Sequence, residues 1–264
     1  GDAHLNLGDI SRYLGKSQQA EVSTRKAIEL NPDLAKAHSN LGAILKDFGK
    51  LKDAEIALRK AIELKPDFAD AHNNLSHLLL TLKIFKEGWE RYEWRWKTKS
   101  SDSKFKLKTN NPRWNQEQSG CVLLWGEQGI GDQIQYLSLV PDFIDKVDKL
   151  IIKLDKRLIP LLKRSIDKNI KIIGKEDLID EIEYEYHLPM GSLSKFLRPS
   201  LNSFKTAKKL KLEFDKERSN KFRKQLLNKK YKKYIGISWK TTSKDSSINS
   251  ITLEEFITGI YSKD

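Results

Sequence analysis

Residues 126–132, with the sequence GEQGIGD, are the part of this chain best suited to act on a ligand. An apolar run at 121–125 precedes them and is typical of a buried strand, and the apolar spacing after them is typical of a helix. Backbone N–H groups at a helix start point outward, and the helix dipole favours negative charge there. Asp132 stands at this start, where a carboxylate can serve as the helix N-cap. A carboxylate that accepts N–H bonds there is stabilised as the anion, so it would be a weaker base.

Other residues of the same turn are candidate contacts to a substrate or donor: Glu127, Gln128, Gly129 and Gly131. Glu127 has an alternative role, in which its carboxylate only braces the loop. The turn is not a P-loop, because no Gly-Lys-Ser/Thr follows it. It is not a full dinucleotide fingerprint either, since Ile134 occupies the third glycine position. ATP hydrolysis and NAD-dependent redox chemistry are therefore disfavoured.

A second candidate site follows a predicted strand at 234–239. The loop after it carries lysines and hydroxyl side chains, and we single out Lys240, Thr241 and Lys244. Ammonium and hydroxyl groups beside a strand end suit a diphosphate. The alternative is a polar surface loop.

The elements that must position these residues are strands alternating with helices. The sequence predicts strands at 121–125, 149–154, 170–173, 184–188 and 234–239, and helices at 133–147, 156–167, 216–228 and 252–262. This alternation predicts a mostly parallel sheet with helices on both faces. A polar linker with Trp114 as a docking anchor precedes the first strand.

A different pattern fills the N-terminal part. Residues 3–36 and 37–70 align without a gap, and 19 of the 34 positions are identical. The 34-residue period, with Leu-Gly pairs, small alanine positions and the closing Pro32 and Pro66, is the signature of tetratricopeptide repeats. A third, atypical copy begins at Ala71. Such hairpins bury their apolar faces by stacking, and we expect the concave face to bind a protein or peptide.

Two features of the repeats have alternative interpretations. His4, His38 and His72 recur at one slot, which favours a packing role over a metal site, because the three lie on separate stacked units. The aromatic run GWERYEWRW at 88–96 crowds the second helix of the third copy. It favours sealing of the last repeat and docking onto the next domain, with sugar stacking as the alternative.

Composition and charge narrow the possible partners and the location of the protein. The net charge is +13, of which residues 1–96 contribute only one unit, with 15 Lys/Arg against 14 Asp/Glu. The basic remainder favours acidic partners, although no nucleic-acid-binding motif is present and a nucleic-acid partner is not expected. A single cysteine excludes an intrachain disulfide and, with no apolar membrane span or signal peptide, favours the cytoplasm. We expect the chain to be a fragment, since it opens inside a repeat and does not begin with Met.

The order of these features resembles that of bacterial tetratricopeptide-repeat glycosyltransferases, over nearly the whole chain. The motifs that carry the resemblance are GWERYEWRW, then Pro112-Arg113-Trp114, then GEQGIGDQIQ. These enzymes have the GT-B fold, are similar to heptosyltransferases and share the architecture of O-GlcNAc transferase. The later segments 187–193 and 235–240 resemble a loop and a strand of the same family less specifically.

The resemblance implies an α-solenoid followed by the N-terminal half of a GT-B fold, which is Rossmann-like. The implied domains are repeats at 1–98, a linker at 99–120, a first Rossmann-like domain at 121–233 and the incomplete start of a second at 234–264. Such an enzyme moves a sugar from a nucleotide-sugar donor to an acceptor hydroxyl, with no metal or other cofactor. Asp132 matches the family's catalytic base, and the loop with Lys240 matches its diphosphate contacts, although Thr241 departs from the usual small residue. We expect this chain alone to be inactive. The rival is a non-catalytic interaction scaffold.

Overall fold

The computed structural model describes residues 1–98, 106–166 and 169–227. They belong to two units, residues Gly1–Glu213 and a second unit that begins at Phe214. The predicted strand at 234–239, the predicted helix at 252–262 and the site residues Lys240, Thr241 and Lys244 lie outside the described residues.

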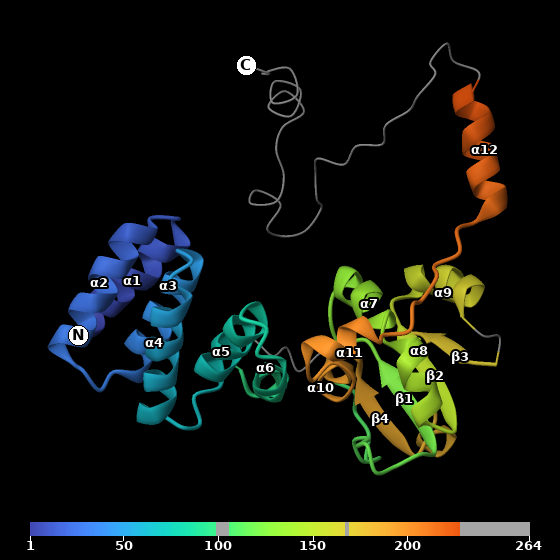
Figure 1. Cartoon of the computed structure of the whole chain (residues 1–264), viewed down its shortest axis with the longest axis horizontal. Coiled ribbons are helices and arrows are strands. Elements are labelled where there is room, and N and C mark those ends of the chain that lie inside the picture. Colours follow the sequence, from blue (N-terminus) through green and yellow to red (C-terminus); the bar gives the residue numbers. More distant parts are fainter. Residues whose placement is uncertain (99–105, 167–168, 228–264) are drawn as a thin grey trace. The chain divides into compact units, whose positions relative to one another are not determined.

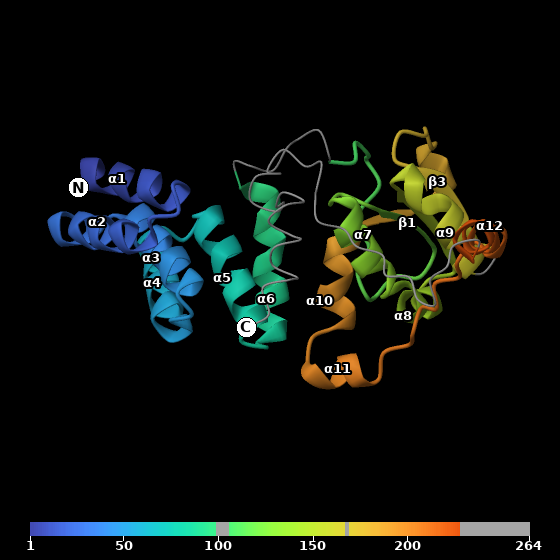
Figure 2. The ribbon, with the colours of Figure 1, turned by 90° about the horizontal axis from the view of Figure 1, so that it is seen from above.

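The N-terminal part is a solenoid of helical hairpins, seen from two sides in Figures 1 and 2. Its first two hairpins are built from α1 (Asp2–Tyr13), α2 (Ser17–Leu30), α3 (Ala35–Asp47) and α4 (Leu51–Leu64). The second helices end two residues before Pro32 and Pro66, as predicted. A Cβ added at Gly42 in α3 would lie 2.5 Å from Leu58 in α4, so the Leu-Gly slot permits this close helix approach.

The recurring histidines are packing residues in the described repeats. Nε2 of His38 lies 2.8 Å from the Pro32 carbonyl oxygen, and Nε2 of His72 lies 2.9 Å from that of Pro66. Each ring therefore ties the start of one repeat to the proline that ends the repeat before it.

The third hairpin differs from the first two. It consists of α5 (Ala69–Thr81) and a short α6 (Phe85–Tyr92), and a 3-10 helix, η1 (Glu93–Lys97), follows directly. The prediction that the aromatic run lies in one helix is therefore wrong for its second half, because Trp94 and Trp96 belong to η1. Through Arg95 of this 3-10 helix, the end of the repeats contacts Glu127 and Ser192 in the next part of the chain.

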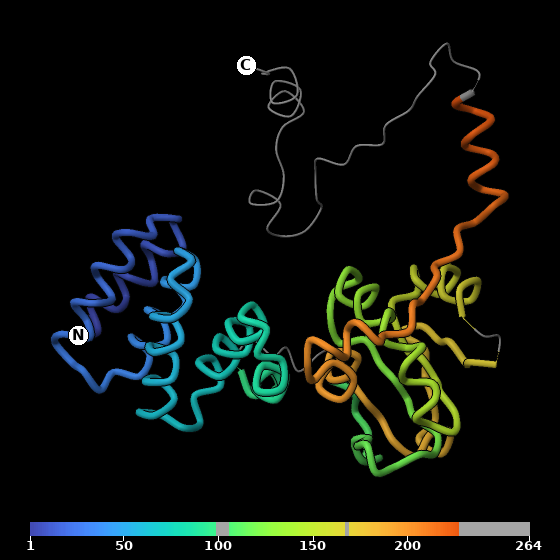
Figure 3. Tube along the Cα trace, in the orientation of Figure 1, coloured from blue at the N-terminus to red at the C-terminus, as the bar shows by residue number. Residues whose placement is uncertain are grey.

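That part contains a parallel sheet in the order β3-β2-β1-β4. The strands are β1 (Cys121–Trp125), β2 (Lys149–Leu154), β3 (Lys171–Gly174) and β4 (Tyr186–Pro189). The four predicted strands that fall within the described residues are confirmed, although β3 and β4 begin one and two residues later than expected. Figure 3 follows the chain from β1 through its helices to β2 and on to β3. An isolated bridge between Arg113 and His187 places the predicted linker beside β4.

Two predicted helices are broken, and a proline explains each break. The expected helix at 133–147 is divided into α7 (Ile130–Leu137), α8 (Val140–Phe143) and η3 (Ile144–Lys146), with Pro141 near the start of α8. The expected helix at 156–167 is divided into η4 (Lys156–Leu158) and α9 (Ile159–Ser165), with Pro160 near the start of α9. Proline lacks an N–H and is tolerated in the first turn of a helix, so each proline marks a new start.

The main core covers one face of the sheet. Val122, Leu124 and Ile152 pack there against Phe143 and against side chains of α9 and of α10 (Leu193–Leu197). Trp114, the predicted anchor, is 2% exposed and lies edge-on to Phe143, 5.0 Å between ring centroids.

The opposite face carries a smaller cluster. Leu123 and Ile151 pack there with Tyr184 and with partly buried side chains such as Leu107. Within the described residues no α-helix contributes to this cluster, which differs from the expected helices on both faces. Right-handed crossovers from β1 to β2 and from β2 to β3 run in one direction and put their helices on one face. The return to β4 would cover the other face, but residues 175–185 hold only a 3-10 turn, η5 (Glu181–Glu183).

Two further helices follow α10. They are α11 (Leu201–Lys205), which has a capping box at Ser200, and α12 (Lys216–Leu227), close to the prediction of 216–228. The α12 helix belongs to the second unit.

Candidate functional site

The glycine-rich turn joins the carboxyl end of β1 to helix α7. The helix begins at Ile130, with Gly129 as its N-cap and no capping side chain. The prediction that Asp132 is the N-cap is therefore wrong, because Asp132 is the third residue of the helix. Its side chain lies in the first turn and the residue is exposed, so a soluble ligand can reach the carboxylate.

The buried side chain of Gln133 holds this turn in place. The residue is 2% exposed, its Nε2 donates to the Gln128 carbonyl at 2.8 Å, and its Oε1 accepts from the Asp155 amide at 2.9 Å. A Cβ added at Gly126 would lie 2.6 Å from the Gln133 side chain. Glycine at 126 thus allows one buried amide to join the loops that follow β1 and β2.

The Glu127 side chain points into the protein. Its side chain is 4% exposed, and its Oε1 accepts from the Gly191 amide at 3.0 Å and from Arg95 Nη2 at 3.0 Å. Gly191 follows β4, so Glu127 joins the loops at the carboxyl ends of the two neighbouring strands β1 and β4. These contacts are what the bracing role predicts.

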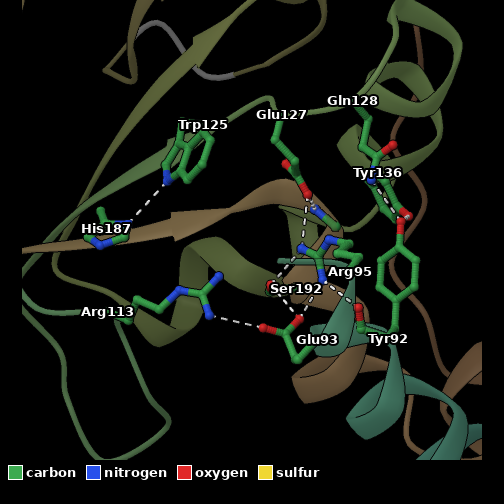
Figure 4. Close-up of polar contacts among 11 residues, drawn as sticks. Tyr92, Glu93, Arg95, Arg113, Trp125, Glu127, Gln128, Tyr136, His187 and Ser192 are labelled. Carbon is green, nitrogen blue, oxygen red and sulfur yellow. Dashed lines mark hydrogen bonds and ion pairs between the residues drawn. The ribbon is translucent and has the colours of Figure 1, made fainter. Parts of the chain in front are cut away.

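Arg95 of η1 is the centre of this cluster (Figure 4). Its guanidinium donates to Glu93 Oε1 at 2.7 Å, to Glu127 Oε1 at 3.0 Å and to Ser192 Oγ at 3.0 Å. Glu93 also accepts from Arg113 at 3.1 Å and from Ser192 Oγ at 2.7 Å. The end of the repeats therefore enters the gap between the β1 and β4 loops. We call these five residues the Arg95 cluster.

The two carboxylates of the cluster differ in their electrostatics. Burial raises the pKa of Glu127 above its ordinary value, and the nearby Arg95 opposes this only in part. Burial also acts to raise the pKa of Glu93, but the charges of Arg95 and Arg113 and the Ser192 hydroxyl outweigh it, so that pKa is lowered. The surroundings of Glu93 thus stabilise its anion more fully than those of Glu127 do. Oε2 of Glu127 and Nε of Arg95 are buried without a hydrogen-bond partner.

Hydrogen bonds that involve aromatic side chains lie on two sides of the cluster. Gln128 Nε2 donates to the Tyr92 hydroxyl at 2.8 Å, which lies 3.3 Å from the Tyr136 hydroxyl. On the other side, Trp125 Nε1 donates to His187 Nδ1 at 3.1 Å (Figure 4), so the neutral His187 ring carries its proton on Nε2. Burial and the nearby Arg113 lower the pKa of His187 to about 4.

The structure thus divides the predicted site. Gly129, Gly131 and Asp132 lie at the exposed start of α7, whereas Glu127 and Gln128 turn inward toward the end of the repeats. The sequence analysis did not identify Arg95, Ser192 or His187 as site residues. Their signal was present, because Arg95 lies in GWERYEWRW and the other two lie in the segment 187–193. Within the described ranges no group of acidic, histidine or cysteine side chains is arranged to hold a metal ion.

The repeats carry a separate groove of about 610 Å³. It opens between the second helices α2 and α4, over α3, rather than along the first helices of the hairpins. Its lining combines apolar and charged side chains, among them Ile28, Leu41, Leu45, Ile56 and Lys60.

Comparisons with known proteins identify the class of the N-terminal part. The sequence profile of the tetratricopeptide repeat matches residues 1–34 and 35–68. This part of the chain is therefore a tetratricopeptide solenoid, an architecture typical of protein-interaction scaffolds. Among the described residues no helix is long and apolar enough to cross a bilayer.

Solved structures with a similar N-terminal part include other repeat domains. The TPR2B domain of yeast Sti1, solved in complex with pHsp70, is 19% identical over 39% of this chain and 86% of its own, with a TM-score of 0.36. The OM64 TPR domain of Arabidopsis is 17% identical over 39% and 84%, with a TM-score of 0.36. PilF of Pseudomonas aeruginosa is 30% identical over 36% and 43%, with a TM-score of 0.35. No curated protein matches the chain.

Proposed function

We propose that the chain is part of a GT-B glycosyltransferase, in which the repeats precede the first of two Rossmann-like domains. The proposed boundaries are repeats at 1–98, a linker at 99–120, the first domain at 121–233 and the start of the second at 234–264. The parallel order β3-β2-β1-β4 supports this, because it matches the first half of a doubly wound sheet. In such sheets the strand order reverses beside β1, and ligands bind at the carboxyl ends of the strands there.

The observation that carries the proposal is the exposed carboxylate of Asp132 in the first turn of α7, directly after the central strand β1. In the proposed reaction it accepts the proton of an acceptor hydroxyl as that oxygen attacks the sugar of a nucleotide-sugar donor. Gly129 and Gly131 keep the approach to the carboxylate open, since neither carries a side chain. The donor diphosphate leaves toward the second domain, where Lys240, Thr241 and Lys244 are the proposed contacts.

The Arg95 cluster has a positioning role in this proposal. It fixes Glu127 and therefore the turn that carries Asp132, and it ties that turn to the last repeat. A partner or acceptor that binds the repeats is then held at a set distance from the reacting atoms, which is the main contribution of proximity to catalysis.

The test is Asp132→Asn in the full-length protein. We expect kcat to fall by about 10²–10⁴-fold, the usual contribution of a general base, with the free energy of unfolding unchanged. Glu217→Gln is the matched control, because Glu217 is an exposed carboxylate in the first turn of α12. Equal rates for Asp132→Asn and the control would contradict the base assignment.

The second candidate is a non-catalytic interaction scaffold that binds a protein or peptide. The groove between α2 and α4 favours it, since Ile56 on its wall is an apolar side chain that is 70% exposed. In that case Ile56→Asp weakens partner binding and Asp132→Asn changes neither binding nor function. The reverse pattern supports the enzyme.

A further inference from the structure

Two adjoining pockets lie where the chain after the repeats crosses the sheet. The first, which we call the lysine pocket, has a volume of about 200 Å³ and is lined by Lys106, Leu107, Lys108, Trp125, Gly126, Lys153 and Lys175. The second, the tryptophan pocket, has a volume of about 240 Å³ and is lined by Trp96, Lys106, Leu107, Thr109, Arg113, Trp125 and His187. The pockets share Lys106, Leu107 and Trp125, so one ligand can occupy both.

The strand register explains why these side chains meet. Trp125 of β1 pairs with Lys153 of β2, and Leu123 of β1 pairs with His187 of β4. Paired residues of parallel strands point to the same face, and residues two apart on one strand do so as well. Trp125, Lys153 and His187 therefore emerge on the face of Leu123, the face to which no described α-helix contributes. The missing helix in the β3–β4 connection leaves room for a ligand there.

The charged side chains that line the two pockets are all cationic, although Glu176, Asp155 and Glu127 act electrostatically on Lys175. Four lysines and Arg113 line the two pockets, and no acidic residue is among the described lining residues. Lys153 and Lys175 are half-buried. Lys153 Nζ donates to the Asp177 carbonyl at 2.6 Å, a neutral acceptor. Burial lowers the pKa of Lys175. Cations held together in a partly desolvated pocket favour an anion.

The tryptophan pocket adds a different chemistry. His187 Nδ1 accepts from the Trp125 indole, so its Nε2–H is the donor available to a ligand. The Arg95 and Arg113 guanidinium carbons lie 4.6 and 5.4 Å from the Trp96 ring centre, and the Trp96 and Trp125 rings are tilted by 46°. This arrangement offers no open parallel slot for a flat nucleobase. An apolar wall with a few neutral and charged donors instead suits a ring that carries hydroxyl groups.

We infer that the two pockets bind an anionic saccharide, with its phosphate or carboxylate group among the lysines and its sugar ring against Trp125 and His187. The identification of the ring as a sugar rests on the proposed function. The anion part rests on the lining residues alone.

The test is calorimetric titration of the 264-residue chain with five small probes. They are glucose 6-phosphate, glucuronate, glucose, inorganic phosphate and AMP. We expect glucose 6-phosphate or glucuronate to bind about tenfold or more tightly than glucose and inorganic phosphate, because a charge-assisted hydrogen bond contributes roughly this factor. The ratio between the two acidic sugars identifies phosphate or carboxylate as the acid group.

Variants locate the binding. Lys153→Met is expected to weaken the tighter acidic sugar about tenfold, whereas Lys149→Met, at the exposed other end of β2, leaves its Kd unchanged. Lys108→Met is a second pocket variant at an exposed position, so its loss of affinity does not depend on packing.

Three results overturn the inference: no binding of either acidic sugar, equal binding of glucose or inorganic phosphate, or tighter binding of AMP. Each is a binding measurement and requires no turnover. An inactive enzyme with intact binding contradicts only the proposed function, and absent binding in an active Asp132-dependent enzyme contradicts only this inference.

Discussion

Replacing Arg95 by Met tests whether the end of the repeats and the glycine-rich turn form one structure. Arg95 is 10% exposed at its side chain and donates to Glu93, Glu127 and Ser192. Methionine keeps much of the length of the side chain but none of the donors. Glu127, 4% exposed, keeps the Gly191 amide as a partner and loses its cation.

The expected cost follows from that buried carboxylate. Removing one partner of a buried ion pair typically costs about 3–5 kcal/mol, because the remaining charge is uncompensated. Protonation of Glu127 limits the cost at low pH. Each unit by which its folded pKa rises corresponds to about 1.4 kcal/mol, so the variant regains at most about 4.1 kcal/mol when the pH is lowered by three units.

The sign of the pH dependence follows from the direction of the shift. Burial already raises the pKa of Glu127 above the ordinary value of 4.5, and loss of Arg95 raises it further. The folded state then binds more protons than the unfolded state, so stability falls as pH rises from about 4.5 through the folded pKa. The variant is therefore least destabilised near pH 5 and most destabilised near pH 8.

The assay is urea unfolding at pH 5 and pH 8, followed by tryptophan fluorescence. Hydrogen exchange at the Gly191 amide, which donates to Glu127, provides a local measurement. Arg113→Met is the matched control, since Arg113 also pairs with Glu93 but its side chain is 43% exposed, and such surface pairs contribute about 0–1 kcal/mol. If Arg95→Met costs no more than Arg113→Met, or costs the same at both pH values, the reasoning about Glu127 is refuted.

Three further outcomes are expected. Gly191→Ala destabilises the chain by about 1–3 kcal/mol in urea unfolding, because its Cβ would lie 2.6 Å from the Glu127 carboxylate, whereas Gly131→Ala, with nothing within 4 Å, is neutral or slightly stabilising. NMR titration of the His187 ring gives a pKa of about 4, so the ring stays neutral from pH 5 to 8, and a pKa near 6.5 would contradict its burial. Gly42→Ala lowers the stability of the repeats by about 1–3 kcal/mol, measured by circular dichroism on heating.

Local patterns were enough to predict the elements. The 34-residue period predicts the hairpins because each unit repeats the same packing problem, and Pro32 and Pro66 mark where the second helices end. The strands at 121–125 and 149–154 were predicted to the residue, since buried parallel strands are short apolar runs. The prolines that mark the helix breaks, Pro141 and Pro160, were also visible in the sequence. The apolar spacing continues through a proline in the first turn of a helix, so periodicity alone did not predict the breaks.

The site was predictable only in part, because it depends on contacts distant in the sequence. The turn at 126–132 was recognised from glycine spacing, and Asp132 is exposed there. Glu127 was left with two roles, and the choice depends on Arg95, 32 residues earlier, and on Gly191, 64 residues later. A single sequence gives no register between strands, so it could not place His187 beside Leu123.

The Arg95 cluster bears directly on where a ligand can bind. In an open parallel sheet a ligand usually binds at the carboxyl ends of the strands, in the gap between the two neighbouring strands where the strand order reverses. Here that gap, between the β1 and β4 loops, is filled by a buried arginine from the end of the repeats. Space at the carboxyl edge of the sheet is left on the other face, where Lys153 and Trp125 line open pockets, and at the exposed start of α7. Trp96 of η1 lines the tryptophan pocket, so a substitution that shifts η1 is expected to change the affinity for a ligand bound there.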